Sequence, residues 1–477
     1  MKYVDVVIDN KSEYMDSFFT YSAPDDINVG DKVTIPLARK SKDVDGYVVS
    51  IDTVPSVELD KIKGITGIEK DRSLTPEIID TAIWMKSRYG VKYIDAIKMF
   101  DVTGKRIPKQ SREYSETKLE TEPMLSDEQN YAVTQISDSI YNALGKSFLI
   151  HGVTNSGKTE VYMRAVKSAL ERGETAIILV PEIALSSQIS ERFSRRFGKG
   201  QVAIMHSKLK TSERLAEWIR IKSGEAKIVI GARTAVFVPA SDIGVIIIDE
   251  EHESTYKSDH NPKYETVDVA FRRAQYHNAT LVLGSATPSI VSYNRAMEGI
   301  YQLIEMKNRI GKSIMPEVQI VDMRDELRSG NSGIISTKLL SSIEQTVNNG
   351  DQVILFLNRR GFSTQVLCPE CGYIMMCPDC DITLTYHKKD DAAICHYCGR
   401  KFKIPEICPE CGNSTLSFIG TGTERLEETI EDLVPTAKVE RFDLDTAKNS
   451  SEIKKTLRRF NSGKTNILVG TQILAKG

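Results

Sequence analysis

Residues 148–160 have the sequence FLIHGVTNSGKTE, in which an apolar run leads into two glycines and a Lys-Thr pair. The apolar run predicts a buried strand, and good helix formers begin at about Lys158. Gly152 and Gly157 stand at the spacing G-x-x-x-x-G-K-T, which is typical of a phosphate-binding P-loop between a strand and a helix. Backbone N–H groups and the helix N-terminus bind phosphate oxygens in such a loop. The stretch therefore predicts a nucleoside triphosphate site.

Two side chains of this loop carry the expected chemistry. Lys158 neutralises the outer phosphates of ATP, and the Thr159 hydroxyl binds Mg²⁺. The alternative is a glycine-rich turn with a surface lysine, which the strand–loop–helix setting disfavours. The loop residues expected to contact ATP are Gly152, Val153, Thr154, Asn155, Ser156, Gly157, Lys158 and Thr159.

A helix start precedes the loop, at Leu125-Ser-Asp-Glu-Gln129. Ser126 is a candidate N-cap, and Gln129 occupies the capping-box position. Gln129 is therefore either a capping residue or the side chain that recognises adenine, since its amide both donates and accepts hydrogen bonds.

Composition excludes several classes of protein. The chain has 477 residues, of which 40% are hydrophobic and 27% charged, as in ordinary globular proteins of about three domains. Its apolar runs stay short of the roughly 18 residues that cross a membrane. Residues 1–10 alternate like a strand and carry two aspartates, unlike a signal peptide. We expect a cytoplasmic protein without membrane contact. The net charge of −2 neither indicates nor excludes DNA binding.

The pattern of strands and helices predicts an α/β protein with two parallel-sheet lobes. A small β-rich N-terminal domain precedes them, and a zinc-binding segment interrupts the second lobe. The predicted divisions are an N-terminal domain at 1–103, a linker at 104–124, lobe 1 at 125–306 and lobe 2 at 307–477, with the insertion at 364–415. The strand at 466–469 is expected to leave an apolar edge uncovered.

Acidic and hydroxyl residues follow two of the predicted buried strands. Asp249 and Glu250 end the run Val245-Ile-Ile-Ile, and a Ser-Ala-Thr triplet, residues 285–287, ends another. In the same sheet as a P-loop, Asp249 is placed to hold Mg²⁺ and Glu250 to deprotonate the attacking water. We expect Lys158, Asp249 and Glu250 to be the catalytic residues.

All eight cysteines fall within residues 368–411, as four C-x-x-C pairs. Their spacing predicts two structural Cys₄ zinc sites. A hairpin predicted between the second and third pairs brings these two together, so the first and fourth pairs share the other zinc. His387 and His396 are expected at the surface. The predicted ligand sets are Cys377, Cys380, Cys395 and Cys398, and Cys368, Cys371, Cys408 and Cys411.

The order of the P-loop, Asp249-Glu-Glu-His252, Ser285-Ala-Thr287 and Gly470-Thr-Gln472 resembles the superfamily 2 helicases. With the cysteine pairs, the chain is more specifically similar to the PriA family of replication-restart DNA helicases. The resemblance implies an ATP-dependent 3′→5′ helicase that recognises stalled or forked DNA and starts primosome assembly. Its two lobes would be RecA-like, the second incomplete. Residues 1–103 would be a 3′-end-type DNA-binding domain, in which Thr20 stands where the family has an aspartate. The resemblance also implies single-stranded DNA, primosome proteins and single-strand-binding proteins as partners.

The same resemblance implies site residues. Gln129 would contact adenine, and an aromatic-rich loop at 252–273 would link DNA contact to hydrolysis. An aromatic and basic loop suits base stacking, although its tyrosines could instead pack beneath a solvated loop. The residues implied to contact DNA are Arg233, His252, Tyr256, Lys257, Tyr264, Thr287 and Thr471.

The resemblance also implies more chain than is present. The family's arginine motif and C-terminal DNA-binding domain would follow Gly477, so we expect residues 1–477 to bind ATP·Mg²⁺ with feeble hydrolysis and no unwinding. Two rival interpretations are a non-catalytic module that binds ATP, zinc and DNA, and a translocase acting on RNA or duplex DNA. The second rival should lack the double zinc ribbon.

Overall fold

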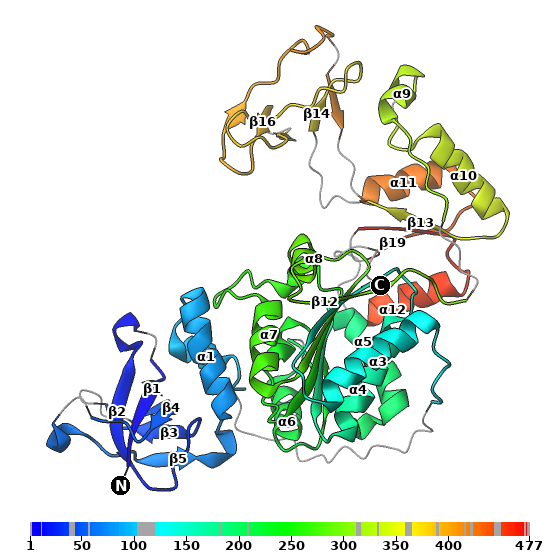
Figure 1. Cartoon of the computed structure of the whole chain (residues 1–477). Helices are drawn as coiled ribbons and strands as arrows, with labels where there is room; N and C mark the ends of the chain where they lie inside the picture. Colours follow the sequence, from blue (N-terminus) through cyan, green and yellow to red (C-terminus); the bar gives the residue numbers. More distant parts are fainter. Residues whose placement is uncertain are drawn as a thin grey trace. The chain divides into compact units, whose positions relative to one another are not determined.

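The protein is represented by a computed structural model (Figure 1). It describes residues 2–10, 12–37, 43–55, 58–102, 120–181, 183–207, 209–311, 316–331, 333–357, 365–387, 391–414, 416–419, 423–442, 450–471 and 474. The chain divides into two compact units, Met1–Ile314 and Met315–Gly477.

The first unit begins with a five-stranded antiparallel sheet in the order β2-β1-β4-β3-β5. Its strands are β1 (Lys2–Ile8), β2 (Phe18–Ala23), β3 (Lys32–Ile35), β4 (Val44–Ile51) and β5 (Gly67–Glu69). Helices α1 (Pro76–Tyr89) and α2 (Tyr93–Lys98) follow. Thr75 caps α1 and Gly90 ends it in the left-handed conformation, with φ of 68°. The predicted β-rich N-terminal region is confirmed.

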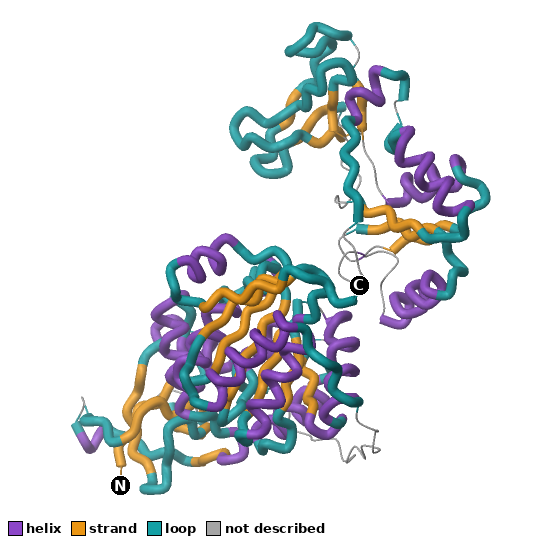
Figure 2. Tube along the Cα trace, turned by 45° about the vertical axis from the view of Figure 1, so that its right-hand side comes forward, coloured by secondary structure: helices purple, strands orange, loops and turns teal. Residues whose placement is uncertain are grey.

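A seven-stranded parallel sheet forms the rest of this unit, in the order β12-β6-β11-β10-β7-β9-β8 (Figure 2). The strands are β6 (Ser147–Gly152), β7 (Thr175–Leu179), β8 (Val202–Met205), β9 (Ile228–Gly231), β10 (Ile243–Asp249), β11 (Thr280–Ser285) and β12 (Gln302–Met306). The helices are α3 (Asp127–Tyr141), α4 (Lys158–Glu171), α5 (Ile183–Phe197), α6 (Thr211–Lys222), α7 (Thr266–His277) and α8 (Ile290–Met297). The predicted α/β lobe is thereby confirmed.

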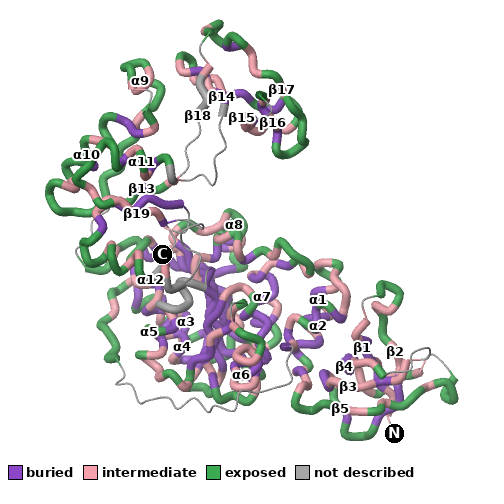
Figure 3. Tube along the Cα trace, turned by 180° about the vertical axis from the view of Figure 1, so that it is seen from behind, coloured by how far each residue is buried: buried purple, intermediate pink, exposed green. Residues whose placement is uncertain are grey.

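Alternate residues of the strands pack on opposite faces of this sheet, which is buried on both (Figure 3). Phe148 and Ile150 of β6 pack in the core on the side of α3, α4 and α5. Leu149 packs in the other core, with residues of α6 and α7. The continuous apolar runs in the sequence follow from this double burial.

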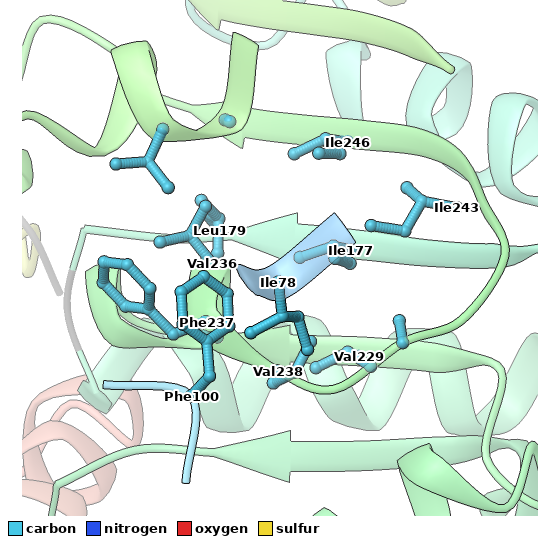
Figure 4. Packing of buried hydrophobic residues seen from close by; sticks show 14 of the residues in the cluster. Ile78, Phe100, Ile177, Leu179, Val229, Val236, Phe237, Val238, Ile243 and Ile246 are labelled. Carbon is cyan, nitrogen blue, oxygen red and sulfur yellow. The ribbon is translucent and has the colours of Figure 1, made fainter. Parts of the chain in front are cut away.

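Helices α1 and α2 share the second of these cores, so the N-terminal region and lobe 1 are one packed body. Figure 4 shows Ile78 and Phe100 beside Phe237 and Val229. The Trp218 indole also donates to the Phe100 carbonyl oxygen over 2.8 Å. Fully burying a side chain such as Phe100 contributes about 1.5–3 kcal/mol. The predicted boundary at residue 103 therefore separates sequence segments that pack together. Residues 104–119 of the predicted linker lie outside the described residues.

In the second unit, β13 (Val353–Phe356), β20 (Ile467–Gly470) and β19 (Val439–Phe442) form a parallel sheet in that order. Its helices are α9 (Met323–Arg328), α10 (Thr337–Asn348), α11 (Thr423–Leu433) and α12 (Ser450–Asn461). The prediction that the strand at 466–469 leaves its edge uncovered is wrong. Since β20 is the central strand, its backbone is paired on both sides.

The cysteine-containing segment forms two small antiparallel sheets. These pair β14 (Gln365–Leu367) with β18 (Ser417–Ile419), and join β15 (Thr385–His387), β16 (Ala392–Ile394) and β17 (Lys401–Phe402). Thr385 lies opposite Ile394 in the β15–β16 pair, which confirms the predicted hairpin between the second and third C-x-x-C pairs. No helix in the described part of the chain is long and apolar enough to cross a membrane.

Candidate active site

The predicted nucleotide-binding residues meet at the carboxyl ends of three adjacent strands. The P-loop follows β6, Ser285 ends β11 and Asp249 ends β10, and these strands are neighbours in the order β6-β11-β10. Ligands of open α/β sheets bind at this edge. The sheet therefore brings together sequence segments about a hundred residues apart.

Both glycines of the P-loop are required by close approach. Gly157 has φ of 84°, and a Cβ at this position would lie 2.2 Å from the Gln129 amide nitrogen. A Cβ on Gly152 would lie 2.7 Å from the Ser156 hydroxyl oxygen. Asn155 also has a positive φ, 65°. At positions 152 and 157, any residue larger than glycine would displace the neighbouring side chains of Ser156 and Gln129.

The loop fits the phosphates of a nucleotide. It borders a cavity of about 630 Å³ that also includes Asp249, Glu250 and Arg192. Lys158 is buried and its Nζ donates to the Gly152 carbonyl oxygen over 2.8 Å. The buried Ser156 hydroxyl has no hydrogen-bond partner among the described residues. A phosphate oxygen accepts from groups of this kind, so the residues present suit the anion.

The capping box predicted at the start of α3 is confirmed. Gln129 Oε1 accepts from the Ser126 backbone N–H at 2.9 Å, and the Ser126 hydroxyl accepts from the Gln129 N–H at 3.3 Å. Gln129 Nε2 also donates to the Gly157 carbonyl oxygen at 3.3 Å. Gln129 lines the nucleotide cavity, but its amide is engaged by the protein. To contact adenine it must exchange these bonds, so adenine recognition stays a prediction.

A segment after β12 closes one wall of the cavity, which sequence reasoning missed. The Ile310 N–H donates to the Asn155 carbonyl oxygen at 2.9 Å, and the Asn308 amide nitrogen donates to Glu128 at 2.7 Å. Arg309 and Gly311 also border the cavity. No spacing rule links this segment to the P-loop, because β12 reaches β6 only through sheet pairing.

Asp249 is half-buried at the end of β10. Burial raises its pKa, and the neighbouring Glu250 carboxylate adds to this effect, so that the pKa reaches about 6. The Tyr162 hydroxyl donates to Asp249 Oδ1 at 3.0 Å, and the Tyr256 hydroxyl donates to the Asp249 carbonyl oxygen at 2.7 Å. A Cβ on Gly284 would lie 1.7 Å from the Tyr162 hydroxyl oxygen. Tyr162 thus connects the P-loop helix, Asp249 and β11, although no motif in the sequence marks it.

The residues after Asp249 join the acidic segment to the Ser-Ala-Thr segment. His252 Nδ1 and the Ser285 hydroxyl oxygen are 2.7 Å apart, and the Thr287 N–H donates to the same oxygen at 2.9 Å. Glu250 has a positive φ of 47°, a conformation rare for residues other than glycine. Its Oε2 lies 3.7 Å from His252 Nδ1. The backbone strain at Glu250 accords with a functional position.

Glu251, for which no role was predicted, is buried. Its carboxylate accepts from the Ser289 N–H at 2.7 Å and from the Ser292 hydroxyl at 2.8 Å. These bonds fasten the end of β10 to the start of α8. The sequence shows Glu251 only as the third of three consecutive acidic residues. It does not indicate the hydrogen-bond partners of Glu251, which lie at the start of α8.

The expectation that Tyr256 and Tyr264 stack on DNA bases is not supported. Both rings are buried, with exposed fractions of 2% and 4%, and the Tyr264 ring contacts Phe237 edge to face. Both tyrosines instead pack beneath the loop, as in the alternative interpretation of this segment. Lys257 is exposed and its carbonyl oxygen accepts from Arg233 at 2.7 Å.

Other residues expected to contact DNA have different positions. Thr287 and His252 are exposed beside the Ser285 segment. Thr471 is buried at the end of β20, in the second unit. Gln472 lies outside the described residues. Their contact with DNA stays a prediction.

The cysteines gather in the two predicted groups, Cys368, Cys371, Cys408 and Cys411, and Cys377, Cys380, Cys395 and Cys398. Within each group the sulfur atoms lie within 4.8 Å of one another. The Cys368–Cys411 and Cys377–Cys398 sulfur distances are 3.6 Å and 3.8 Å. A tetrahedron of thiolates about 2.3 Å from zinc has edges of about 3.8 Å, so both groups fit zinc.

Comparisons with known proteins match these parts of the chain. The DEAD/DEAH box helicase model matches residues 129–296, the PriA 3′ DNA-binding domain model 5–100, and the PriA DNA helicase Cys-rich region model 377–402. A replication restart protein PriA of Rickettsia conorii is 36% identical over 464 residues, which cover 96% of this chain and 70% of the relative.

The chain belongs to the PriA family of replication restart proteins. A PriA protein of Bacillus subtilis is 48% identical over 75% of this chain and 44% of its own length. One of Chlamydia muridarum is 41% identical over 74% of this chain and 48% of its own length. The chain thus spans about half the length of several PriA relatives that it matches.

The PriA Cys-rich region model covers the inner four cysteines alone, since it matches residues 377–402. The outer group is therefore supported by the geometry of Cys368, Cys371, Cys408 and Cys411 alone.

We predict two zinc ions per chain and one in Cys395→Ser, because the buried Cys395 belongs to the inner group alone. The variant should lose the fold around β15 and β16 and keep ATP binding, since the P-loop lies in the other compact unit. Metal content by plasma mass spectrometry and ATP affinity check this. His396→Asn is the matched control and should retain both ions. One zinc in the wild type would contradict the prediction.

Proposed function

We propose that this chain contains the DNA-binding and motor parts of an ATP-dependent 3′→5′ DNA helicase. It would recognise stalled or branched replication forks and initiate primosome assembly. Membership of the PriA family supports the proposal, as does the DEAD/DEAH helicase match. The structural observation that carries it is the meeting of the P-loop, Asp249–Glu250 and Ser285 at one edge of a parallel sheet.

The proposed roles follow from position and charge. Lys158 and the P-loop N–H groups would hold the phosphates, and Thr159 and Asp249 would hold Mg²⁺. Bound Mg²⁺ neutralises charge that develops on the phosphates. Glu250 would orient and deprotonate the attacking water. Asp249 is a suitable Mg²⁺ ligand because partial burial and the neighbouring Glu250 charge make a bare carboxylate unfavourable there.

DNA would be held by the N-terminal region and by loops beside the motor. The match of residues 5–100 to a 3′ DNA-binding domain supports this role for the β1–β5 sheet. In that sheet the Thr20 hydroxyl donates to Asp5 at 2.9 Å, which places a carboxylate beside Thr20. Arg233, Thr287 and Thr471 remain the proposed backbone contacts. Primosome and single-strand-binding proteins remain the proposed protein partners.

Strand displacement and ATP hydrolysis test the proposal together. In a protein of full PriA-family length that contains this chain, we expect hydrolysis of Mg·ATP to rise with single-stranded DNA, and a forked duplex to be unwound from a 3′ tail in preference to a 5′ tail. Lys158→Ala is the control for both measurements. DNA-stimulated hydrolysis without unwinding would favour a translocase, and DNA binding without hydrolysis would favour a recruiting module.

A further inference from the structure

Tyr162 connects the P-loop helix to a proposed Mg²⁺ ligand. It lies one helical turn after Lys158 on α4, and its side chain is buried, with an exposed fraction of 2%. Its hydroxyl donates to Asp249 Oδ1 over 3.0 Å. The P-loop motif ends at Thr159, so this contact follows from the packing of α4 against β10 and not from a sequence motif.

The surroundings of Tyr162 leave its hydroxyl little freedom. A Cβ on Gly284 would lie 1.7 Å from the hydroxyl oxygen and 2.9 Å from the ring carbon that bears it. Gly284 lies opposite Asp249 in the register of β10 and β11. The hydroxyl therefore lies against the backbone of β11 beside the end of β10, and it needs glycine at position 284.

The backbone of Asp249 is held by a different tyrosine. The Tyr256 hydroxyl donates to the Asp249 carbonyl oxygen at 2.7 Å, and β10 stays paired with β11 as far as Asp249. The carboxylate can still rotate about its side-chain bonds. The hydrogen bond from Tyr162 restrains that rotation, whereas the bond from Tyr256 restrains the main chain.

A carboxylate that binds a metal ion benefits from such a restraint. An ionised carboxylate has about four lone-pair sites, so a hydrogen bond at Oδ1 leaves sites for a metal. Asp249 borders the nucleotide cavity together with Thr159, the other residue proposed to hold Mg²⁺. Hydrogen-bond partners orient the ligands of a metal, and loss of such a partner typically lowers metal affinity about 10- to 100-fold.

We propose that Tyr162 is a positioning residue that orients the Asp249 carboxylate for the Mg²⁺ of bound Mg·ATP. Tyr162 acts through Asp249, since it does not itself border the nucleotide cavity. The inference rests on the proposed function, because it requires the Mg²⁺ site at Thr159 and Asp249.

Equilibrium binding of a fluorescent, non-hydrolysable ATP analogue tests the inference without any need for hydrolysis. The affinity is measured in excess Mg²⁺ and again in EDTA, and the ratio of the two is the gain that Mg²⁺ provides. Tyr162→Phe removes the hydroxyl and keeps the ring. We expect it to lower the gain about tenfold and to leave the affinity in EDTA within about twofold of wild type.

Two further variants separate the possible results. Tyr256→Phe is the matched control, because it removes a hydroxyl that bonds the carbonyl oxygen of the same aspartate, and it should keep the gain within about twofold. Asp249→Asn should lose most of the gain. If Asp249→Asn keeps the gain, the proposed Mg²⁺ site fails and the inference fails with it.

If Asp249→Asn loses the gain, the proposed Mg²⁺ site stands and three results would overturn the inference alone. The first is a wild-type gain in Tyr162→Phe. The second is an equal loss of gain in Tyr256→Phe and Tyr162→Phe. The third is a loss of affinity in Tyr162→Phe that is the same in Mg²⁺ and in EDTA, because the hydroxyl would then support the P-loop helix and not the metal ligand.

Discussion

Glu250→Gln should lower ATP hydrolysis by about 10²- to 10⁴-fold and leave ATP affinity nearly unchanged. Glu250 directly follows β10, beside the half-buried Asp249, in a strained conformation with φ of 47°. Glutamine has the same size but cannot accept the proton of the attacking water. Steady-state hydrolysis and binding of a fluorescent ATP analogue measure the two effects separately.

Two variants control this experiment. Lys158→Ala should weaken ATP binding, because Lys158 contributes charge to the phosphates. Glu253→Gln changes a nearby acid and should hydrolyse ATP at a near-normal rate, since it retains the backbone N–H that donates to the Glu250 carbonyl oxygen. Equal losses of ATP affinity in Glu250→Gln and Lys158→Ala would refute the division of roles.

Arg273→Ala should destabilise the first unit by about 3–5 kcal/mol at neutral pH. Arg273 is fully buried, and its Nε and Nη2 each donate to Glu77 at 2.9 Å. Its Nη1 donates to the carbonyl oxygens of Val236 and Val238. The variant leaves a buried carboxylate and two carbonyls without their donor. Denaturant unfolding of both proteins measures the difference, and Arg195→Ala, at an exposed ion pair, should cost at most about 1 kcal/mol.

The contribution of the Glu77–Arg273 pair to stability should depend on pH. Burial alone would raise the pKa of Glu77, but Arg273 and His277 lower it to about 2, from 4.5 for an exposed group. The pair therefore stabilises the fold above about pH 4.5, and this contribution is lost as the pH falls toward 2. Without Arg273, protonation of Glu77 relieves a buried charge. The stability difference between wild type and Arg273→Ala should narrow from pH 7 to pH 3, and a constant difference would contradict the assignment.

Local sequence pattern was enough to predict the helices and strands and several of the site residues. The apolar run before Gly152 predicted β6, the Ser126–Gln129 spacing predicted a capping box, and the cysteine spacing with its hairpin predicted both ligand groups. Each of these features depends on residues close in sequence, so that backbone geometry and side-chain type determine it directly.

Tertiary structure alone decided which distant groups meet. Tyr162 reaches Asp249 because α4 packs against β10, and the segment after β12 reaches the P-loop because β12 pairs with β6. The sequence also left open whether Tyr256 and Tyr264 face DNA or the interior, and the packing around Phe237 buried them. Hydrophobic periodicity shows that a side chain has an apolar neighbour without identifying it. The identity of that neighbour depends on strand order and helix packing, which are set by the whole core.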